Sequence, residues 1–233
     1  MTEIILEVKN LSVEFDGEKI IDRLSFKVKR GEFISIIGPN GSGKTTLLKA
    51  LLGLIPYKGK IKWKKDMKIN YLPQWFSKEN FNSLPISVKE FFELKGIKED
   101  KMYSLLSKVG VSYNRLKHKN PGKLSAGQLQ RILLAWTFSD DPDVVLLDEP
   151  TTGIDVGGKK TIYDLLSLFW KGRKVTIFIV THEINIVSSL STNVICLHKK
   201  CLAFGKPEDV LQTPILEKTY GTKIKFHTHR VKK

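Results

Sequence analysis

An eight-residue run, GPNGSGKT at residues 38–45, is the feature that most narrows what this chain can fold into. It follows a continuous apolar stretch, Phe33–Ile37, which is typical of a strand buried on both faces. A stretch with helical character runs from about Lys44 to Leu52. The run fits the pattern G-x-x-x-x-G-K-[S/T], whose glycines let successive backbone N–H groups point at a phosphate. The sequence therefore predicts a phosphate-binding loop at a strand–helix junction.

The side chains of this run suit a nucleotide phosphate. Lys44 would place positive charge toward β- and γ-phosphates, and the Thr45 hydroxyl is suited to ligate Mg²⁺. The N-terminus of the helix adds a favourable dipole. We expect nine consecutive residues to bind the nucleotide: Gly38, Pro39, Asn40, Gly41, Ser42, Gly43, Lys44, Thr45 and Thr46.

A second apolar run, VVLL at residues 144–147, is followed by two carboxylates, Asp148 and Glu149. A buried strand would deliver Asp148 to the carboxyl edge of the sheet, where ligands bind in open α/β folds. Asp148 would hold Mg²⁺ directly or through water, and Glu149 could accept a proton from an attacking water. Alone, this pattern fits an ordinary strand-end turn equally well. Beside the phosphate loop it predicts the second half of a nucleotide site.

The segment LSAGQ at residues 124–128 precedes an amphipathic helix. Ser125 and Gln128 have the spacing of a capping box, so a well-capped helix start accounts for both. The small residues Ala126 and Gly127 also leave the first N–H groups of the helix open to an anion. The chain thus contains a second helix start suited to an anion.

Strands that alternate with helices favour a mostly parallel α/β sheet. The first third of the chain alternates apolar and polar residues as strands do, and the part from Gln74 to about Pro121 has helical character. Further elements are predicted as follows: strands around Lys60–Trp63 and Lys68–Leu72 on either side of a turn, strands Asp143–Leu147 and Val175–Val180, a helix Lys159–Trp170, and a hairpin of Val194–Leu197 with Cys201–Phe204.

Composition excludes several classes of protein. Two cysteines cannot form a disulfide framework, and no apolar run approaches the roughly 18 residues that span a bilayer. Because the N-terminus lacks the pattern of a signal peptide, we expect a soluble, cytoplasmic chain. The 39 Lys and Arg residues exceed the 24 Asp and Glu residues, a formal net charge of +15 that favours anionic partners or simply marks a lysine-rich solvated surface.

Taken in order, GPNGSGKT, YLPQ at 71–74, LSAGQ, VVLLDEP and the pair Thr181-His182 resemble the nucleotide-binding subunit of an ATP-binding cassette (ABC) transporter. The resemblance runs from about residue 5 to residue 205. It implies an α/β fold with a P-loop NTPase (RecA-like) core, an N-terminal antiparallel β part at about 1–35 and 55–72, and an inserted helical part at about 75–138. The remaining segments complete the core of this single domain, with a tail at about 206–233.

The resemblance also implies an activity and partners. The chain would hydrolyse ATP with Mg²⁺, form a dimer with an identical or a different ATPase subunit, and drive a separate integral membrane permease. A solute-binding protein would be a further partner and nucleic acid would not. The chain would lie at the cytoplasmic face of the cell membrane.

Roles for individual residues follow only from the resemblance. They are these: Gln74 senses the γ-phosphate and contacts the metal, His182 contacts the γ-phosphate, Asp155 belongs to a loop that crosses the dimer interface, Phe15 stacks on adenine, and Ser125, Gly127 and Gln128 contact the nucleotide of the opposite subunit. Taken singly, Gln74 fits a loop amide, His182 a capping residue and Phe15 a core residue. Two positions depart from the usual pattern, Ala126 where glycine is commoner and Phe15 where tyrosine is usual.

The transported solute is less clearly marked. The segment leading to YLPQ, the run at residues 153–158 and the ending at residues 216–221 look most similar to ATPases of zinc and manganese importers. His227 and His229 could bind a divalent metal, or could belong to a basic tail. The main alternative is a soluble ABC ATPase that acts on nucleic acid or ribosomes, for which the charge of +15 would be the primary support. A small-molecule phosphotransferase would leave LSAGQ and His182 unexplained.

Overall fold

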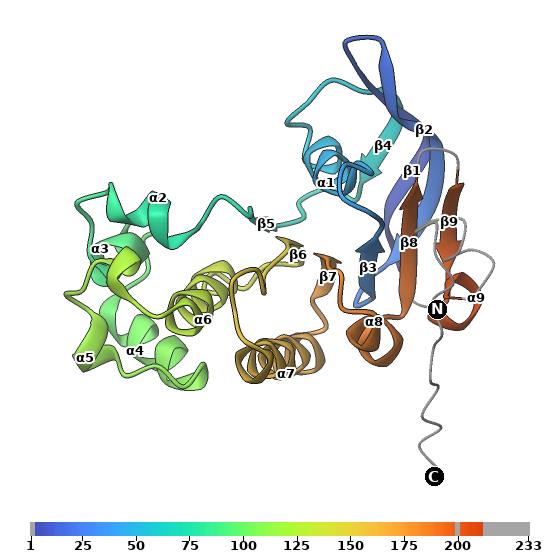
Figure 1. The fold of residues 1–233 in the computed structure, drawn as a ribbon. Coiled ribbons are helices and arrows are strands. Elements are labelled where there is room, and N and C mark those ends of the chain that lie inside the picture. The colour runs from blue at the N-terminus through green and yellow to red at the C-terminus, as the bar shows by residue number, and fades with distance from the viewer. Residues whose placement is uncertain (1–2, 199–200, 212–233) are drawn as a thin grey trace.

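The computed structural model describes residues 3–198 and 201–211 of the chain. Two β-sheets organise it (Figure 1). The smaller is antiparallel, with strand order β2-β1-β4, and the larger has six strands in the order β5-β6-β7-β3-β8-β9. The strands are β1 Ile4–Phe15, β2 Glu18–Lys29, β3 Phe33–Ile37, β4 Lys58–Trp63, β5 Ile69–Leu72, β6 Val144–Asp148, β7 Thr176–Val180, β8 Asn193–His198 and β9 Cys201–Gly205.

Most of the six-stranded sheet is parallel. Strands β5, β6, β7, β3 and β8 all run in the same direction, and only β9 pairs antiparallel, with β8. Every residue of β3, β6 and β7 is buried, which explains their unbroken apolar sequences. In contrast, β2 alternates buried and exposed residues, because only one face of the smaller sheet packs on the core.

The helices lie on both sides of the larger sheet and at one end of the molecule (Figure 1). Helices α2 to α5 gather at that end, away from the antiparallel sheet, and form the helical part with α6 beside them. The helices are α1 Lys44–Leu51, α2 Lys78–Asn82, α3 Val88–Glu93, α4 Glu99–Lys108, α5 Tyr113–Leu116, a 3₁₀ turn Pro121–Lys123, α6 Ala126–Thr137, α7 Val156–Arg173, α8 Ile184–Leu190 and α9 Pro207–Val210. No helix within the described ranges has the length and apolar character of a membrane span.

The structure divides residues 55–72, expected above to lie together in the β-rich part. Strand β4 pairs with β1 in the smaller sheet, as expected. Strand β5 belongs to the larger sheet instead, where it pairs in parallel with β6 and Ile69 lies opposite Val144. The pairing begins at Asp143, whose backbone N–H donates to the Lys68 carbonyl and whose side chain accepts from the Lys68 N–H. Residues 33–35, also assigned to the β-rich part, start the central strand β3 of the larger sheet.

Helix α7 begins three residues earlier than the sequence predicts and ends at Arg173. The pair Gly157-Gly158 disfavours a helix in isolation. However, the Asp155 side chain accepts a hydrogen bond of 2.7 Å from the Gly158 N–H and caps the helix. Local capping therefore outweighs the low helix propensity of the two glycines.

One ionic cluster joins the helical part to the larger sheet. Asp140, just after α6, accepts hydrogen bonds from Lys95 Nζ at 2.8 Å and from Asn70 Nδ2 at 2.7 Å, and pairs with Lys68 Nζ at 3.1 Å. Burial acts to raise the pKa of Asp140, but these three donors more than offset it and hold the pKa at about 2. The cluster fixes the position of α6 relative to β5.

Candidate functional site

Parallel pairing brings the predicted motifs to one edge of the larger sheet. The loop 38–43 follows β3, Asp148 ends β6, and His182 follows β7. The register places Ile36 and Asp148 each opposite Val180. Gln74 follows β5, the neighbour of β6. The carboxyl ends of parallel strands meet at one edge, so segments more than a hundred residues apart in sequence converge there.

The phosphate loop needs glycine at two positions for reasons that the structure makes specific. Gly38 has φ of 153°, and a Cβ at this position would lie 2.2 Å from the Leu197 carbonyl oxygen and 2.5 Å from Ser42 Oγ. Gly43 has φ of 94°, and a Cβ there would lie 2.8 Å from Ile20 Cγ2. Side chains at either position would push the loop away from β8 or from β2.

Two polar groups of the loop fit an anionic ligand. Lys44 is buried, and its Nζ donates to the carbonyl oxygens of Gly38 at 3.0 Å and Pro39 at 2.9 Å. Burial lowers the pKa of Lys44, and the charges of Glu149 and Asp148 act to raise it. In the described part of the chain, the Ser42 hydroxyl is the one buried side-chain polar atom without a hydrogen-bond partner. A phosphate oxygen in the loop would supply that partner.

Asp148 and Thr45 together offer the donor set that Mg²⁺ prefers. Thr45 Oγ1 donates to Asp148 Oδ2 at 2.8 Å, and the Tyr71 hydroxyl donates to the same oxygen at 3.4 Å. Asp148 is 2% exposed, and burial raises the pKa of its carboxyl despite the hydrogen bond from Thr45. Hard oxygen donors from a hydroxyl and a carboxylate at one point fit Mg²⁺, although the direct role of these residues stays a proposal.

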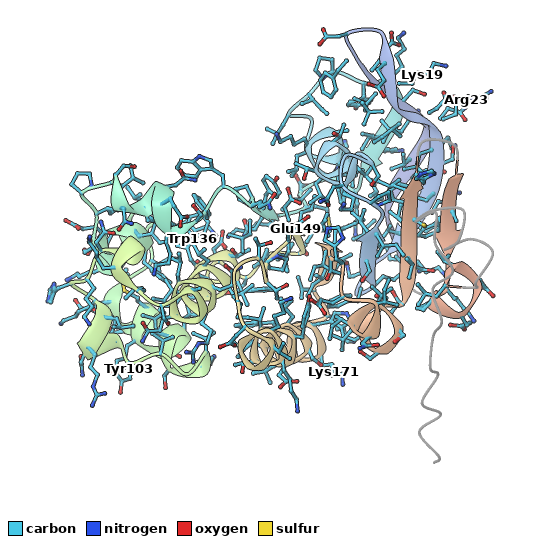
Figure 2. The ribbon with its side chains drawn as sticks, viewed as in Figure 1. Lys19, Arg23, Tyr103, Trp136, Glu149 and Lys171 are labelled. Carbon is cyan, nitrogen blue, oxygen red and sulfur yellow. The ribbon has the colours of Figure 1, made fainter. Side chains whose placement is uncertain are left out.

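Glu149, labelled near the centre of Figure 2, contacts one side chain of its own loop and one from each of two other segments. Its Oε2 accepts hydrogen bonds from Gln74 Nε2 at 3.2 Å and from Thr152 Oγ1 at 3.1 Å, and its Oε1 lies 3.1 Å from His182 Nε2. Its backbone has φ of 50°, a conformation that non-glycine residues rarely adopt. Such residues persist only where the surroundings hold them, and they are common in active sites. A carboxylate placed in this way can accept a proton from water.

The phosphate loop opens into a cleft of about 410 Å³. Phe15, at the end of β1, is 44% exposed and borders this cleft, as an aromatic ring that stacks on a base would. Ten described residues line it, and the sequence singles out all of them except Ile20: Phe15, Ile20, Asn40, Gly41, Gly43, Lys44, Thr45, Thr46, Gln74 and Glu149.

The residues of the LSAGQ segment lie at the start of α6, outside the set that lines this cleft. The predicted capping box is present: Ser125 Oγ accepts from the Gln128 N–H at 3.2 Å, and Gln128 Oε1 accepts from the Ser125 N–H at 3.1 Å. A Cβ at Gly127 would meet no described atom within 4 Å. Asp155 likewise stands apart, as the N-cap of α7. Their predicted contacts with a second subunit stay predictions.

Three residues of the site were not expected from the sequence. Ile20 packs against the loop at Gly43, Tyr71 contacts Asp148, and Thr152 contacts Glu149. Tyr71 lies within the segment YLPQ, which was singled out, so its position there was the available signal. Thr152 lies two residues after VVLLDEP, outside the segments that were singled out. Ile20 lies on a different strand and carries no such signal.

Comparisons with known proteins agree with this geometry. The sequence pattern that defines the ABC transporter family matches residues 21–152. The chain is 36% identical to the zinc import ATP-binding protein ZnuC of Wigglesworthia glossinidia brevipalpis over 222 residues, 94% of each chain. It is 33% identical to ZnuC of Haemophilus influenzae over 231 residues, 97% of this chain and 85% of that one.

The chain belongs to the ABC transporter family. It is an ATP-binding subunit that hydrolyses ATP, and ABC ATPases of this kind work with membrane permeases. The predicted α/β fold class is confirmed. An ABC transporter solved in an inward-facing conformation matches with a TM-score of 0.83 at 25% identity, over 95% of this chain and 90% of that one. A nucleotide-free ATP-binding cassette, at 21% identity, shows the same fold with a TM-score of 0.77 over 96% of this chain and all of that one.

Replacing Asp148 with asparagine should stabilise the protein without nucleotide at neutral pH. Burial raises the pKa of Asp148 above its unfolded value, so the ionised carboxylate opposes folding above the folded-state pKa. Below the unfolded pKa of about 4 the group is protonated in both states and this cost disappears. We expect Asp148→Asn to melt about 2–4 °C higher than the wild type at pH 8 and at the same temperature near pH 4.

The matched control is Asp164→Asn, which removes the same charge from an exposed position on α7. Its melting temperature should follow the wild type at both pH values. If Asp148→Asn melted at or below the wild type at pH 8, the carboxylate would be stabilised where it lies, and the stated cost of its burial would be wrong.

Proposed function

We propose that this chain is the ATPase subunit that powers uptake of a divalent metal ion, zinc or manganese, through a separate membrane permease. The observation that carries the proposal is the match to two proteins named for zinc import at 36% and 33% identity along almost the whole chain. The site supports the ATPase half of the proposal, because cleft, phosphate loop and carboxylates lie together. His227 and His229, which could bind metal, lie outside the described residues.

The proposed reaction is attack of water on the γ-phosphate of ATP. Lys44 and the N–H groups of the loop would neutralise charge that develops on the phosphates. Thr45, Asp148 and Gln74 would hold Mg²⁺, which would supply positive charge to offset that of the phosphates. Glu149 would take the proton of the attacking water, and His182 would donate a hydrogen bond to the γ-phosphate.

Coupling to transport would require two ATPase subunits. In this proposal Ser125, Gly127 and Gln128 of one subunit bind the γ-phosphate held by the other, and Asp155 lies at the interface between them. The helix start at Gly127 is open in the single chain, as such a contact needs. Closure on ATP and opening after hydrolysis would move the permease at the cytoplasmic face of the membrane.

Glu149→Gln should retain ATP binding but slow hydrolysis by about two to four orders of magnitude, because the amide keeps the volume and loses the base. Its oxygen can still accept from Gln74 or Thr152, so the loop keeps its contacts. Phosphate release measures turnover, and size-exclusion chromatography with ATP should show a trapped dimer. Turnover equal to that of the wild type would remove Glu149 from the role of base.

Mixing two inactive variants tests the arrangement between subunits. Gly127→Asp adds a negative charge where the structure has room and where a helix start favours it, so the variant should fold and bind ATP as a monomer. It should neither dimerise nor hydrolyse ATP, because the carboxylate repels the partner's phosphate. Lys44→Ala should lose tight ATP binding. In a mixed dimer, the intact Lys44 of the Gly127→Asp subunit faces the intact Gly127 of the Lys44→Ala subunit, which completes one of the two sites. We therefore expect ATPase activity to return when the two variants are mixed.

Gly127→Ala is the control, since it adds a Cβ without charge and should stay active. A substitution at Ser125 would also remove the N-cap of α6, whereas Gly127→Asp leaves that cap in place. If Gly127→Asp already lost ATP binding as a dilute monomer, the segment would act within its own subunit and the dimer arrangement would be wrong.

The transport proposal is tested with the membrane protein that co-purifies with this chain. In vesicles that contain both, ATP should drive accumulation of Zn²⁺ or Mn²⁺, and Glu149→Gln should abolish it. Accumulation of a different solute would refute the metal assignment. ATPase activity stimulated by RNA or ribosomes in a salt-sensitive manner, without any effect of the membrane protein, would instead support the soluble alternative.

A further inference from the structure

A buried hydroxyl on α7 links the two loops that carry Glu149 and His182. The Tyr163 hydroxyl lies 2.9 Å from Thr181 Oγ1 and 3.2 Å from Thr151 Oγ1. All three residues are buried, with Tyr163 at 4% exposure. Thr151 follows Glu149 by two positions, and Thr181 directly precedes His182. One side chain of a helix therefore contacts both loops at once.

Helix α7 also contacts Glu183, the residue that follows His182. Glu183 Oε1 pairs with Lys159 Nζ at 2.6 Å, and the Glu183 N–H donates to Thr181 Oγ1 at 3.1 Å. Lys159 lies four residues before Tyr163, so the two side chains share one face of α7. Both neighbours of His182 are thus attached to one rigid helix face.

The hydroxyl contacts form a continuous chain in which either partner of each Tyr163 contact can donate. Thr181 Oγ1 accepts from the Glu183 N–H, which leaves its own hydrogen available to Tyr163, and each hydroxyl in the chain can donate once and accept as well. The ring of Tyr163 belongs to the larger hydrophobic core. Burial raises the pKa of its hydroxyl, so the group stays protonated and keeps its donor.

We propose that Tyr163 is a positioning residue for ATP hydrolysis: its hydroxyl fixes the loop of His182 against the loop of Glu149. The inference rests on the proposed function of those two residues. Tyr163 is outside the residues that line the phosphate-loop cleft, so it acts through His182 and Glu149, which lie 3.1 Å apart. Without the hydroxyl the two loops lose this buried side-chain link and keep the backbone bond from the Glu149 N–H to the Val180 carbonyl, at 3.2 Å, so the distance between the two side chains is held less firmly.

Tyr163→Phe removes the hydroxyl and keeps the ring in the core. We expect kcat for ATP hydrolysis to fall about tenfold while KM for ATP changes by less than about twofold, because the phosphate loop is untouched. The matched control is Tyr113→Phe. Tyr113 is also buried, and its hydroxyl bonds Glu99 in the helical part. Its loss should leave kcat unchanged, and an equal fall in both variants would overturn the inference.

A double-mutant cycle separates positioning from general damage. If Tyr163 acts through His182, then adding Tyr163→Phe to His182→Ala should lower kcat by less than about twofold further, because the residue that the hydroxyl positions is already missing. Multiplication of the two effects on kcat would overturn the inference.

Thr181 provides a second test that does not depend on the folding of Tyr163→Phe. Thr181→Val keeps the shape and removes the hydroxyl, and should lower kcat about as much as Tyr163→Phe. Thr181→Ser keeps the hydroxyl and should restore kcat. Equal activity of the valine and serine variants would overturn the inference.

The role of His182 in hydrolysis and the positioning role of Tyr163 can be tested separately. If His182→Ala hydrolysed ATP at the wild-type rate, the proposed role of His182 would be refuted, and so would the positioning role of Tyr163. If His182→Ala were impaired and Tyr163→Phe behaved like Tyr113→Phe, only the positioning role would be refuted.

Discussion

Parallel pairing at the centre of the larger sheet is the constraint on which the rest of the structure depends. Strands β3, β7 and β6 lie side by side and point the same way. The loop of Lys44, the pair Asp148-Glu149 and His182 therefore leave the sheet at one edge. A register shift of one residue between β6 and β7 would turn Asp148 to the opposite face. The fully buried strands prevent such a shift, because their side chains are packed on both faces.

The site is assembled from groups that do not favour the folded state. Burial lowers the pKa of Lys44 and raises that of Asp148, and the Ser42 hydroxyl is buried without a partner in the described part of the chain. The positive φ of Glu149 adds strain. Each group suits a charged, oxygen-rich ligand rather than the protein itself. The groups that suit ligand binding at this edge of the sheet thus lower the stability of the protein without ligand, as is common in enzymes.

Local patterns could be predicted and distant pairings could not. The phosphate loop and the capping box of Ser125 and Gln128 depend on residues within a few positions, so their spacing was sufficient. The strand that pairs with Ile69–Leu72 is β6, about seventy residues further along the chain, and nothing in the sequence of the short strand predicts this pairing. The early start of α7 depends on the hydrogen bond that the Gly158 N–H donates to the Asp155 side chain. From the sequence alone, Tyr163 is indistinguishable from the other core residues of an amphipathic helix, because the partners of its hydroxyl come from two other segments.

The insertion of the helical part between two neighbouring strands affects how the chain must fold. The chain leaves the sheet after Leu72 and returns at Val144 on the adjacent strand, so β5 and β6 can pair only when residues 73–143 close as a loop. If that loop were unstructured, its closure would carry the entropy of a long flexible segment. Once α2 to α6 have packed, the ends are already near each other and Asp140 holds them through Lys95 and Asn70. The order of events would then run from the helical part to the edge of the sheet, and early helix packing would set the rate of the last strand pairing.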